Sequence, residues 1–241
     1  MFRKLLIVFA SAAILSLVAF AGAWIVGGED ARREFAQEGG WHFGDEDEDL
    51  GPTKTREFAI ESGSQIAMEV PVDLSFTRGE TASMTVKGPE KLLERLVWED
   101  GRLKLDGRRS HWGDGLKVVI TAPEIEGLDL DAPGDVTLVG LDQDQFTLKA
   151  NGALDLEAEG KVRTMAVTTN GAGNIDLAKL YGDDVKVEVN GAGDVTLGPK
   201  RLAEIEINGV GHVTLVRKPE ILRSNINGLG SVDHDYAKAD M

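Results

Sequence analysis

One short phrase recurs through the second half of the chain and constrains the fold more than any other feature. It reads NGAGNIDL, NGAGDVTL, NGVGHVTL and, at the last occurrence, NGLGSV. Aligned on the residue three before the second glycine, successive copies lie 18 to 20 residues apart. A fixed period of this length is typical of a solenoid, in which each repeat forms one coil. The aligned residues are Asp131, Asn151, Asn170, Asn190, Asn208 and Asn227.

The apolar residues keep one phase relative to these anchors. Before Asn190, for example, Val185, Val187 and Val189 alternate with polar residues, and positions five and seven after most anchors are also apolar. Period-two alternation predicts two short strands flanking each corner, each with one buried face. A meander of hairpins could also use Asn-Gly turns, but it needs neither a fixed period nor an identical turn at each step. We therefore predict an all-β parallel β-helix with coils of about 19 residues.

The corner itself explains why the phrase repeats. Like positions of successive coils lie about 4.8 Å apart, so the corner asparagines are expected to form a hydrogen-bonded ladder. Asn and Gly also tolerate a left-handed backbone, which we expect the corner to demand. Because the second copy reads NGALDL, with Leu154 in place of glycine, that corner is expected to be bulged or wider. The predicted ladder consists of Asn151, Asn170, Asn190, Asn208 and Asn227.

Other sites of chemistry are not predicted. A dinucleotide loop needs glycine at the sixth position before a helix, where this chain has Asp176 and Thr196 before a strand. The four histidines lack the spacing of a zinc site, and cysteine is absent. We therefore predict no catalytic residue, no metal and no cofactor. The acidic run Asp45 to Asp49 lacks the pattern of a calcium loop and is interpreted as a solvated linker, although metal binding there stays open.

The repeated phrase resembles the putative auto-transporter adhesin head GIN domain family of bacterial envelope proteins. The resemblance covers about Glu57 to Val232 and includes LKVVITAPEIEGLDLDAPGDVTL, residues 116 to 138, as the first coil. It implies a right-handed β-helix, export, and a suspected adhesive or structural role. Leu154 departs from the pattern, and we expect no membrane barrel after the last coil.

A polar stripe is the one candidate binding surface. The residue after the second glycine of most corners is polar, and stacking would place these residues on one edge. The alternative is that their side chains cap the turns by hydrogen bonding to the backbone of the same corner. The stripe comprises Asp135, Asn174, Asp194, His212 and Ser231.

The N-terminal region predicts export. Arg3 and Lys4 precede an apolar run at residues 5–26, which fits a cleaved signal peptide or an uncleaved anchor in the cytoplasmic membrane. The remaining chain would then lie in the periplasm or cell envelope. The predicted organisation is a signal or anchor (1–26), an acidic Gly-rich linker (27–55), a β-helix domain (56–233) and a tail (234–241). Within the domain, residues 56–123 are expected to form strands of a terminal cap and residues 124–233 the regular coils.

These features predict a non-enzymatic envelope protein that presents stacked polar edges to a polysaccharide, a wall component or another protein. The net charge of −15 disfavours nucleic acid as a partner. The alternative is a polysaccharide-active lyase or hydrolase on the same scaffold, which rests on fold analogy. The oligomeric state is left open.

Overall fold

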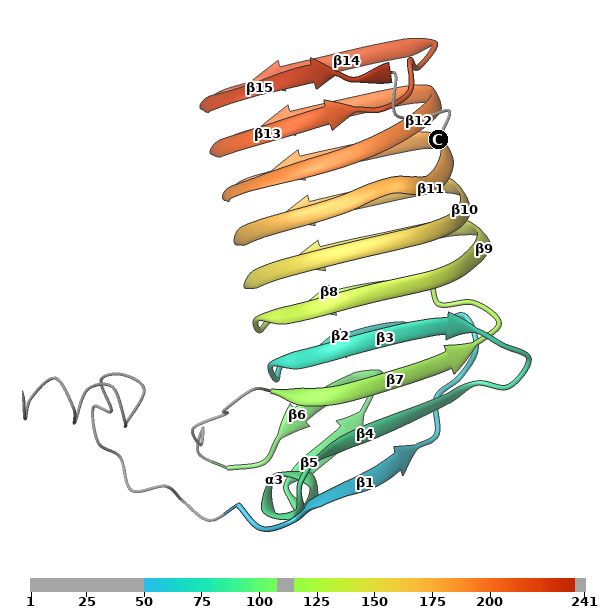
Figure 1. Ribbon diagram of the computed structural model, residues 1–241, viewed down its shortest axis with the longest axis vertical. Coiled ribbons are helices and arrows are strands. Elements are labelled where there is room, and N and C mark those ends of the chain that lie inside the picture. Colours follow the sequence, from blue (N-terminus) through green and yellow to red (C-terminus); the bar gives the residue numbers. More distant parts are fainter. Residues whose placement is uncertain (1–49, 108–114, 237–241) are drawn as a thin grey trace, which may run out of the picture. The chain divides into compact units, whose positions relative to one another are not determined.

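A computed structural model describes residues 50–107 and 115–236 of the chain. These residues form a β-solenoid with one short helix, and Figure 1 shows its coils stacked in chain order from β9 to β15. The coils are built from β9 (Gly134–Ala150), β10 (Ala153–Thr169), β11 (Ala172–Val189), β12 (Ala192–Ile207), β13 (Val210–Leu215), β14 (Ile221–Ile226) and β15 (Leu229–His234).

Each coil has two faces joined by two corners. The segment after an Asn-Gly corner forms face 1, and the segment before the next Asn-Gly corner forms face 2. Strands β9 to β12 run through both faces, whereas β13 and β15 lie on face 1 and β14 on face 2. All pairs between successive coils are parallel. Apart from register shifts near the return corner of β9 to β12, like positions lie opposite each other, as in Val187 opposite Val167 and Ile205. The predicted parallel coils are confirmed.

The core follows the predicted phase. Phe146, Met165, Val185 and Ala203 stack at one inward position of face 2, and all are at least 97% buried. The inward positions of face 1 behave the same way, as Val195 and the residues stacked on it show. Because each aliphatic side chain meets its counterpart one coil above and below, the core is a set of continuous apolar columns.

The asparagine ladder is present along the Asn-Gly corners of the stack. Each amide Nδ2 donates to the side-chain oxygen one coil earlier, beginning with Asn151 to Asp131 at 2.6 Å. The next steps measure 2.7, 3.0, 3.0 and 3.1 Å. The backbone N–H of each asparagine also bonds to the preceding coil, for example Asn190 to the Thr169 carbonyl at 2.7 Å. The corner is therefore fixed by two parallel chains of hydrogen bonds.

A left-handed corner is not the rule, because among the described glycines of the Asn-Gly corners only Gly173 has a positive φ, of 148°. Asp100 is the only described residue other than glycine with a positive φ, and the first glycines of the corners, such as Gly191, do not have one either. The corner glycines are required by close approach instead. A Cβ on Gly191 would overlap the carbonyl oxygen of Gly171, and one on Gly209 would overlap that of Gly191. Corner backbones stack directly on one another, which leaves no room for a side chain.

The expected bulge at Leu154 is also wrong. Leu154 pairs in register with Gly134 on one side and Gly173 on the other. Its side chain points inward and is 96% buried. Leucine fits here because its register partners in both neighbouring coils are glycines, which have no side chain to occupy the same interior space.

A cap closes the N-terminal end of the stack. On face 1, β9 continues into β3 (Val72–Arg78), then β7 (Leu116–Ala122), and then the antiparallel β4 (Ser83–Pro89) and β1 (Thr53–Phe58). On face 2, β8 (Gly127–Leu130) leads to β2 (Gln65–Met68), β6 (Arg102–Leu105) and the antiparallel β5 (Leu96–Glu99). The short helix α3 (Glu90–Glu94) buries Leu92 and Leu93 against this end.

The sequence predicted strands of a terminal cap at residues 56–123, and β1 to β7 lie within residues 53–122, so that β1 begins inside the segment predicted as linker. However, residues 116–138 do not form a first coil on their own, because β3 pairs with both β7 and β9 and lies between them. The alternating residues VDLSFTR form β3. This strand comes earlier in the chain than β7 and occupies the position between β7 and β9.

Several predictions fall outside the described residues: the apolar run at 5–26, the acidic run Asp45 to Asp49, and most of the tail. No helix in the described part of the chain is long and apolar enough to span a membrane.

Candidate functional site

The outer surface of face 1 carries a continuous polar column. Parallel register places Asp135, Asp155, Asn174, Asp194, His212 and Ser231 opposite one another in successive coils. All five predicted stripe residues therefore occur in this one column. Most of them are exposed, and Ser231 is half-buried.

The structure adds two carboxylates that the sequence interpretation missed. Asp155 belongs to the column but follows Leu154 rather than a second glycine, so the motif did not select it. Counting four residues from each corner anchor would have found it. Asp73 extends the column into the cap, because β3 places it opposite Asp135. No repeat marks Asp73, so only the tertiary pairing could reveal it.

The bonds within the column differ along its length. Asn174 donates from both its backbone N–H and its Nδ2 to Oδ1 of Asp155, at 3.2 and 3.1 Å. At the cap, Asp73 pairs with Lys117 at 3.2 Å. In the described residues, no side-chain hydrogen bond or ion pair holds Asp135 or Asp194. These two carboxylates are available to an external ligand.

The turn-capping alternative predicts bonds from stripe side chains to the backbone of their own corners. In the described parts of the chain, Asn174, His212 and Ser231 bond to side chains of neighbouring coils, and no such bond holds Asp135 or Asp194. The column is thus not explained by local caps.

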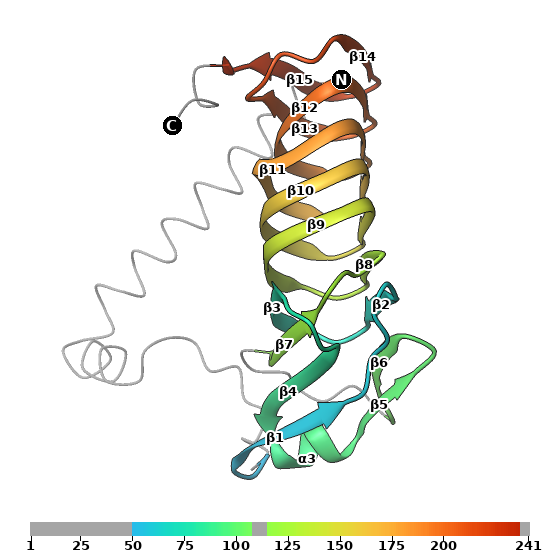
Figure 2. The ribbon, with the colours of Figure 1, turned by 90° about the vertical axis from the view of Figure 1, so that its right-hand side faces the viewer.

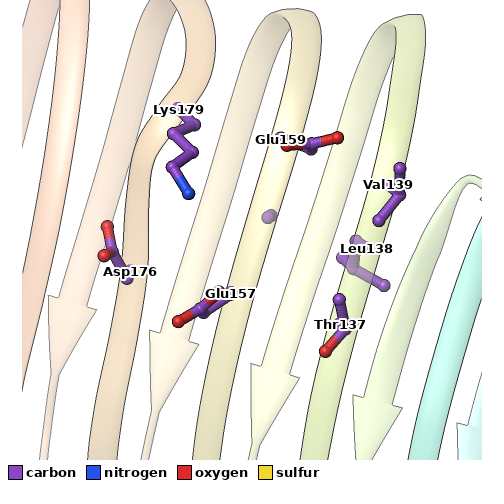
Figure 3. A pocket seen from close by; sticks show the side chains of 8 residues that line it. Thr137, Leu138, Val139, Glu157, Glu159, Asp176 and Lys179 are labelled. Carbon is purple, nitrogen blue, oxygen red and sulfur yellow. The ribbon is translucent and has the colours of Figure 1, made fainter. Parts of the chain in front are cut away.

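A second polar column runs beside the first. Thr137, Glu157 and Asp176 are opposite one another in register, and Figure 3 shows them on neighbouring coils. They line a shallow hollow of about 50 Å³ together with Glu159 and Lys179 near the return corner. Figure 3 shows the Lys179 side chain extending over the same surface. Hydroxyl, carboxylate and ammonium groups therefore meet within one stretch of face 1.

A larger open groove of about 320 Å³ lies where the first column meets the cap. Its walls include Asp73, Asp135 and Asp155 and the corner residues Ala153 and Ala172. Carboxylates that accept hydrogen bonds next to small apolar groups suit a ligand with hydroxyls on one side and C–H groups on the other. No group of three or more metal-ligating side chains occurs among the described residues.

Three residues at the end of the column have the connectivity of a hydrolase triad. Ser231 Oγ lies 2.9 Å from His212 Nδ1, and His212 Nε2 pairs with Asp233. However, the side chains of His212 and Asp233 are 48% and 56% exposed. An activated nucleophile needs preorganised donors in a water-excluded site, which such exposure does not supply. We interpret this group as a surface hydrogen-bond network.

The fold and this surface define a class: a β-solenoid domain whose outer face carries stacked polar columns. The family model for the putative auto-transporter adhesin, head GIN domain, matches residues 64–219. The chain belongs to this family, as the repeated corner phrase predicted.

The chain is also similar to solved structures, of which the one with a TM-score above 0.5 shows the fold. A putative adhesin from Bacteroides fragilis has a TM-score of 0.60 and 19% identity, covering 76% of this chain and 97% of its own. A putative adhesin from Parabacteroides merdae has 15% identity and a TM-score of 0.42, covering 76% of this chain and 96% of its own. A putative lipid binding protein from Parabacteroides distasonis has 17% identity and a TM-score of 0.39, covering 76% of this chain and 97% of its own. No curated protein matches the chain.

Proposed function

We propose that this protein is a non-enzymatic binding domain of the cell envelope, which holds a hydroxyl-rich polymer such as a polysaccharide along the polar columns of face 1. The observation that carries the proposal is the column itself, in which Asp135, Asp155, Asn174 and Asp194 repeat at the spacing of the coils. A repeating ligand can meet a repeating set of hydrogen-bond partners, which a solenoid supplies over a long rigid surface.

The groove at the cap end supports the same reading. It gives one segment of the polymer a recessed place beside Asp135 and Asp155, while the rest lies on the open face. Charge limits the ligand, because a column of carboxylates repels anionic polymers. The ligand we propose is therefore neutral or cationic.

The cellular place follows from the family and from the N-terminal sequence. Membership in an adhesin-like family supports an exported protein of the envelope. The cleaved signal, the retained anchor and the right-handed winding that the family implies are parts of this proposal. So is a role for the stripe residues in adhesion.

Binding to a panel of neutral and amino-sugar polysaccharides, measured by co-sedimentation with insoluble polymers, tests the proposal. We expect the double variant Asp155→Ala, Asn174→Ala to lose at least about tenfold in affinity, because two or more hydrogen bonds to the ligand are removed. The matched control is Thr164→Ala, an exposed position of the same coil on face 2.

Three results would contradict the proposal. Equal loss in the control and the double variant would show that face 1 is not the site. Absence of binding to every polymer would point to a protein ligand. Release of shortened sugar chains during the incubation would make the protein an enzyme and return attention to the His212 network.

A further inference from the structure

The two ends of the coil stack are different. The cap covers the N-terminal end, whereas the C-terminal end is formed by β14 and β15 (Figures 1 and 2). Among the described strands, β14 pairs only with β12 and β15 pairs only with β13. Each of the two strands therefore has one edge to which no described strand is added. Such an edge is a template for another strand.

The backbone groups at this edge belong to residues that face inward. The N–H of Asn227 bonds back to Ile207 at 2.7 Å, and those of Leu229 and Asp235 bond back to Gly209 and Leu215 at 2.9 and 2.8 Å. Consecutive residues of a strand direct their backbone groups to opposite edges. The groups that point to the open edge thus belong to Leu222, Ser224 and Ile226 on β14, and to Gly230, Val232 and His234 on β15.

The same residues occupy core positions without a coil above them. In register, Leu222 continues the column of Ala203, and Ile226 continues that of Ile207. Ala203 and Ile207 are fully buried, but Leu222 and Ile226 are 39% and 40% exposed. The last coil therefore presents both unpaired backbone groups and uncovered core side chains.

Face 2 of this coil is complementary to itself. If β14 pairs antiparallel with β14 of a second copy and Ser224 lies opposite Ser224, then Leu222 lies opposite Ile226. Apolar residues then meet apolar residues, the small polar residue meets itself, and every pair exchanges the backbone groups that point to the edge. Shifting the register by one residue would place inward side chains opposite outward ones.

Face 1 obeys the same symmetry. A Cβ on Gly230 would lie 3.1 Å from Ile207 Cγ2, so the positions of Gly230 and Ile226 oppose each other across the core. Two residues further from the corner on each strand, Val232 opposes Ser224. One two-fold axis through Ser224 and Val232 therefore also pairs Val232 with Val232 and Gly230 with His234. The same axis therefore pairs the backbone groups at the open edges of both β14 and β15.

From this coincidence we infer that the last coil is the docking surface for a second copy of the chain, joined end to end about that axis. The two caps then lie at the outer ends of one continuous double-length solenoid, and face 1 of one copy continues as face 1 of the other. Each chain has a net charge of −15, so salt strengthens the association by screening repulsion.

Cysteine cross-linking tests the axis directly, because the chain has no cysteine of its own. In the full chain, held in mild detergent, Ser224→Cys should form a disulfide-linked dimer under mild oxidation. Opposed residues of a hydrogen-bonded antiparallel pair have Cα atoms about 5.5 Å apart, within disulfide range. The control is Arg223→Cys, whose two copies are separated by a further two residues along the strand and face outward. We expect at least about tenfold faster linkage at position 224.

A second pair of variants separates edge pairing from other contacts. Ser224→Pro removes only the N–H that points to the open edge, so the monomer folds and the dimer is lost in sedimentation. Ser224→Ala keeps that N–H and keeps the dimer. Equal linkage at positions 223 and 224, or a folded wild-type chain that sediments as a monomer at high salt and high concentration, overturns the inference. The second result would assign the edge to residues 237–241 or to a different protein.

Discussion

The coil stack and the cap pair their strands in different ways. In the coils, every strand pairs with the strand one coil away on the same face, always parallel and at a shift of 17 to 20 residues. In the cap, β3 lies between β7 and β9, and β1, β4, β5 and β6 pair partly antiparallel. The coils can therefore grow by addition of identical units, whereas the cap must end the sheet. This difference teaches that repetition extends a solenoid and irregularity terminates it.

The two regions also differ in how interactions are distributed. A coil contacts only the coils above and below it. The stability of the stack is therefore approximately the sum of the stability of each coil and of its interfaces with its neighbours. The cap brings together segments that are far apart, such as Arg56, which donates to the carbonyls of Leu93 and Leu96 at 2.7 and 2.8 Å. We expect damage to a coil to stay local and damage to the cap to affect the cap as a whole.

The largest effect is expected at a corner glycine. Gly191→Val places a side chain against the carbonyl oxygen of Gly171, which is backbone and cannot turn away. We expect a loss of more than about 4 kcal/mol in the free energy of unfolding, measured by urea denaturation. The neighbouring Ala192→Val is the control, because Ala192 is exposed and Val210 occupies the same position one coil later. Similar losses in both variants would refute close approach as the reason for the glycine.

Core truncation in the two regions sharpens the comparison. Leu148 in β9 and Leu103 in β6 are both fully buried. Each Leu→Ala change should lower the free energy of unfolding by about 2–5 kcal/mol. Hydrogen exchange distinguishes them: Leu148→Ala should speed exchange in β9 and its neighbours alone, and Leu103→Ala should do so throughout the cap. Faster exchange over all coils in the Leu148 variant would show that the stack is one cooperative unit.

The asparagine ladder contributes less. Asn190 donates to Asn170 and Glu188, at 3.0 and 2.8 Å, and accepts from Asn208. Asn190→Leu should lower stability by about 1–2 kcal/mol, because each bond contributes roughly 0.5–1.5 kcal/mol and the site is partly exposed to water. Asn208→Leu should behave similarly. Thermal melting measures both, with Thr168→Leu on the outer surface of face 2 as a control, and unchanged melting would mean that the ladder only follows from the corner backbone.

The smallest effect is expected at surface ion pairs of both regions. In the cap, the hydrogen bond from Lys104 holds the pKa of Glu99 below its ordinary value and raises the pKa of Lys104. A depressed glutamate pKa stabilises the fold at neutral pH, and this contribution is lost as the pH falls through the folded pKa. Thermal melting should therefore show Glu99→Gln to be slightly less stable than the wild type at neutral pH and equally stable in acid.

Its counterpart in the coils gives the control. There Asp144 accepts a hydrogen bond from Arg163 at 3.0 Å and raises the arginine pKa. Asp144→Asn should have an equally small effect on melting at neutral pH, because both pairs are exposed and screened. A large loss in either variant would show that an ion pair, and not packing, decides the stability of that region.

The coils could be predicted almost residue by residue, and the reason is their locality. The phase of Val185, Val187 and Val189 fixed which side faces inward, and the spacing of the corners fixed which residues stack. The same arithmetic predicted the polar column but overlooked Asp155, because Leu154 masked the motif. The conformation of the corner was predicted wrongly. Glycine has two uses, left-handed backbone and close approach, and the sequence does not distinguish them.

The sequence by itself determined the coil, its period, its inner face, its asparagine ladder and the family, because these depend on residues one repeat apart. The tertiary structure alone decided the order of strands in the cap, the addition of Asp73 to the polar column, and the groove beside it. It also decided that the last coil presents Ser224 and Val232 on one axis. Those features depend on pairing between segments that carry no common motif. Their partners are chosen by which edges and apolar surfaces the rest of the fold leaves uncovered.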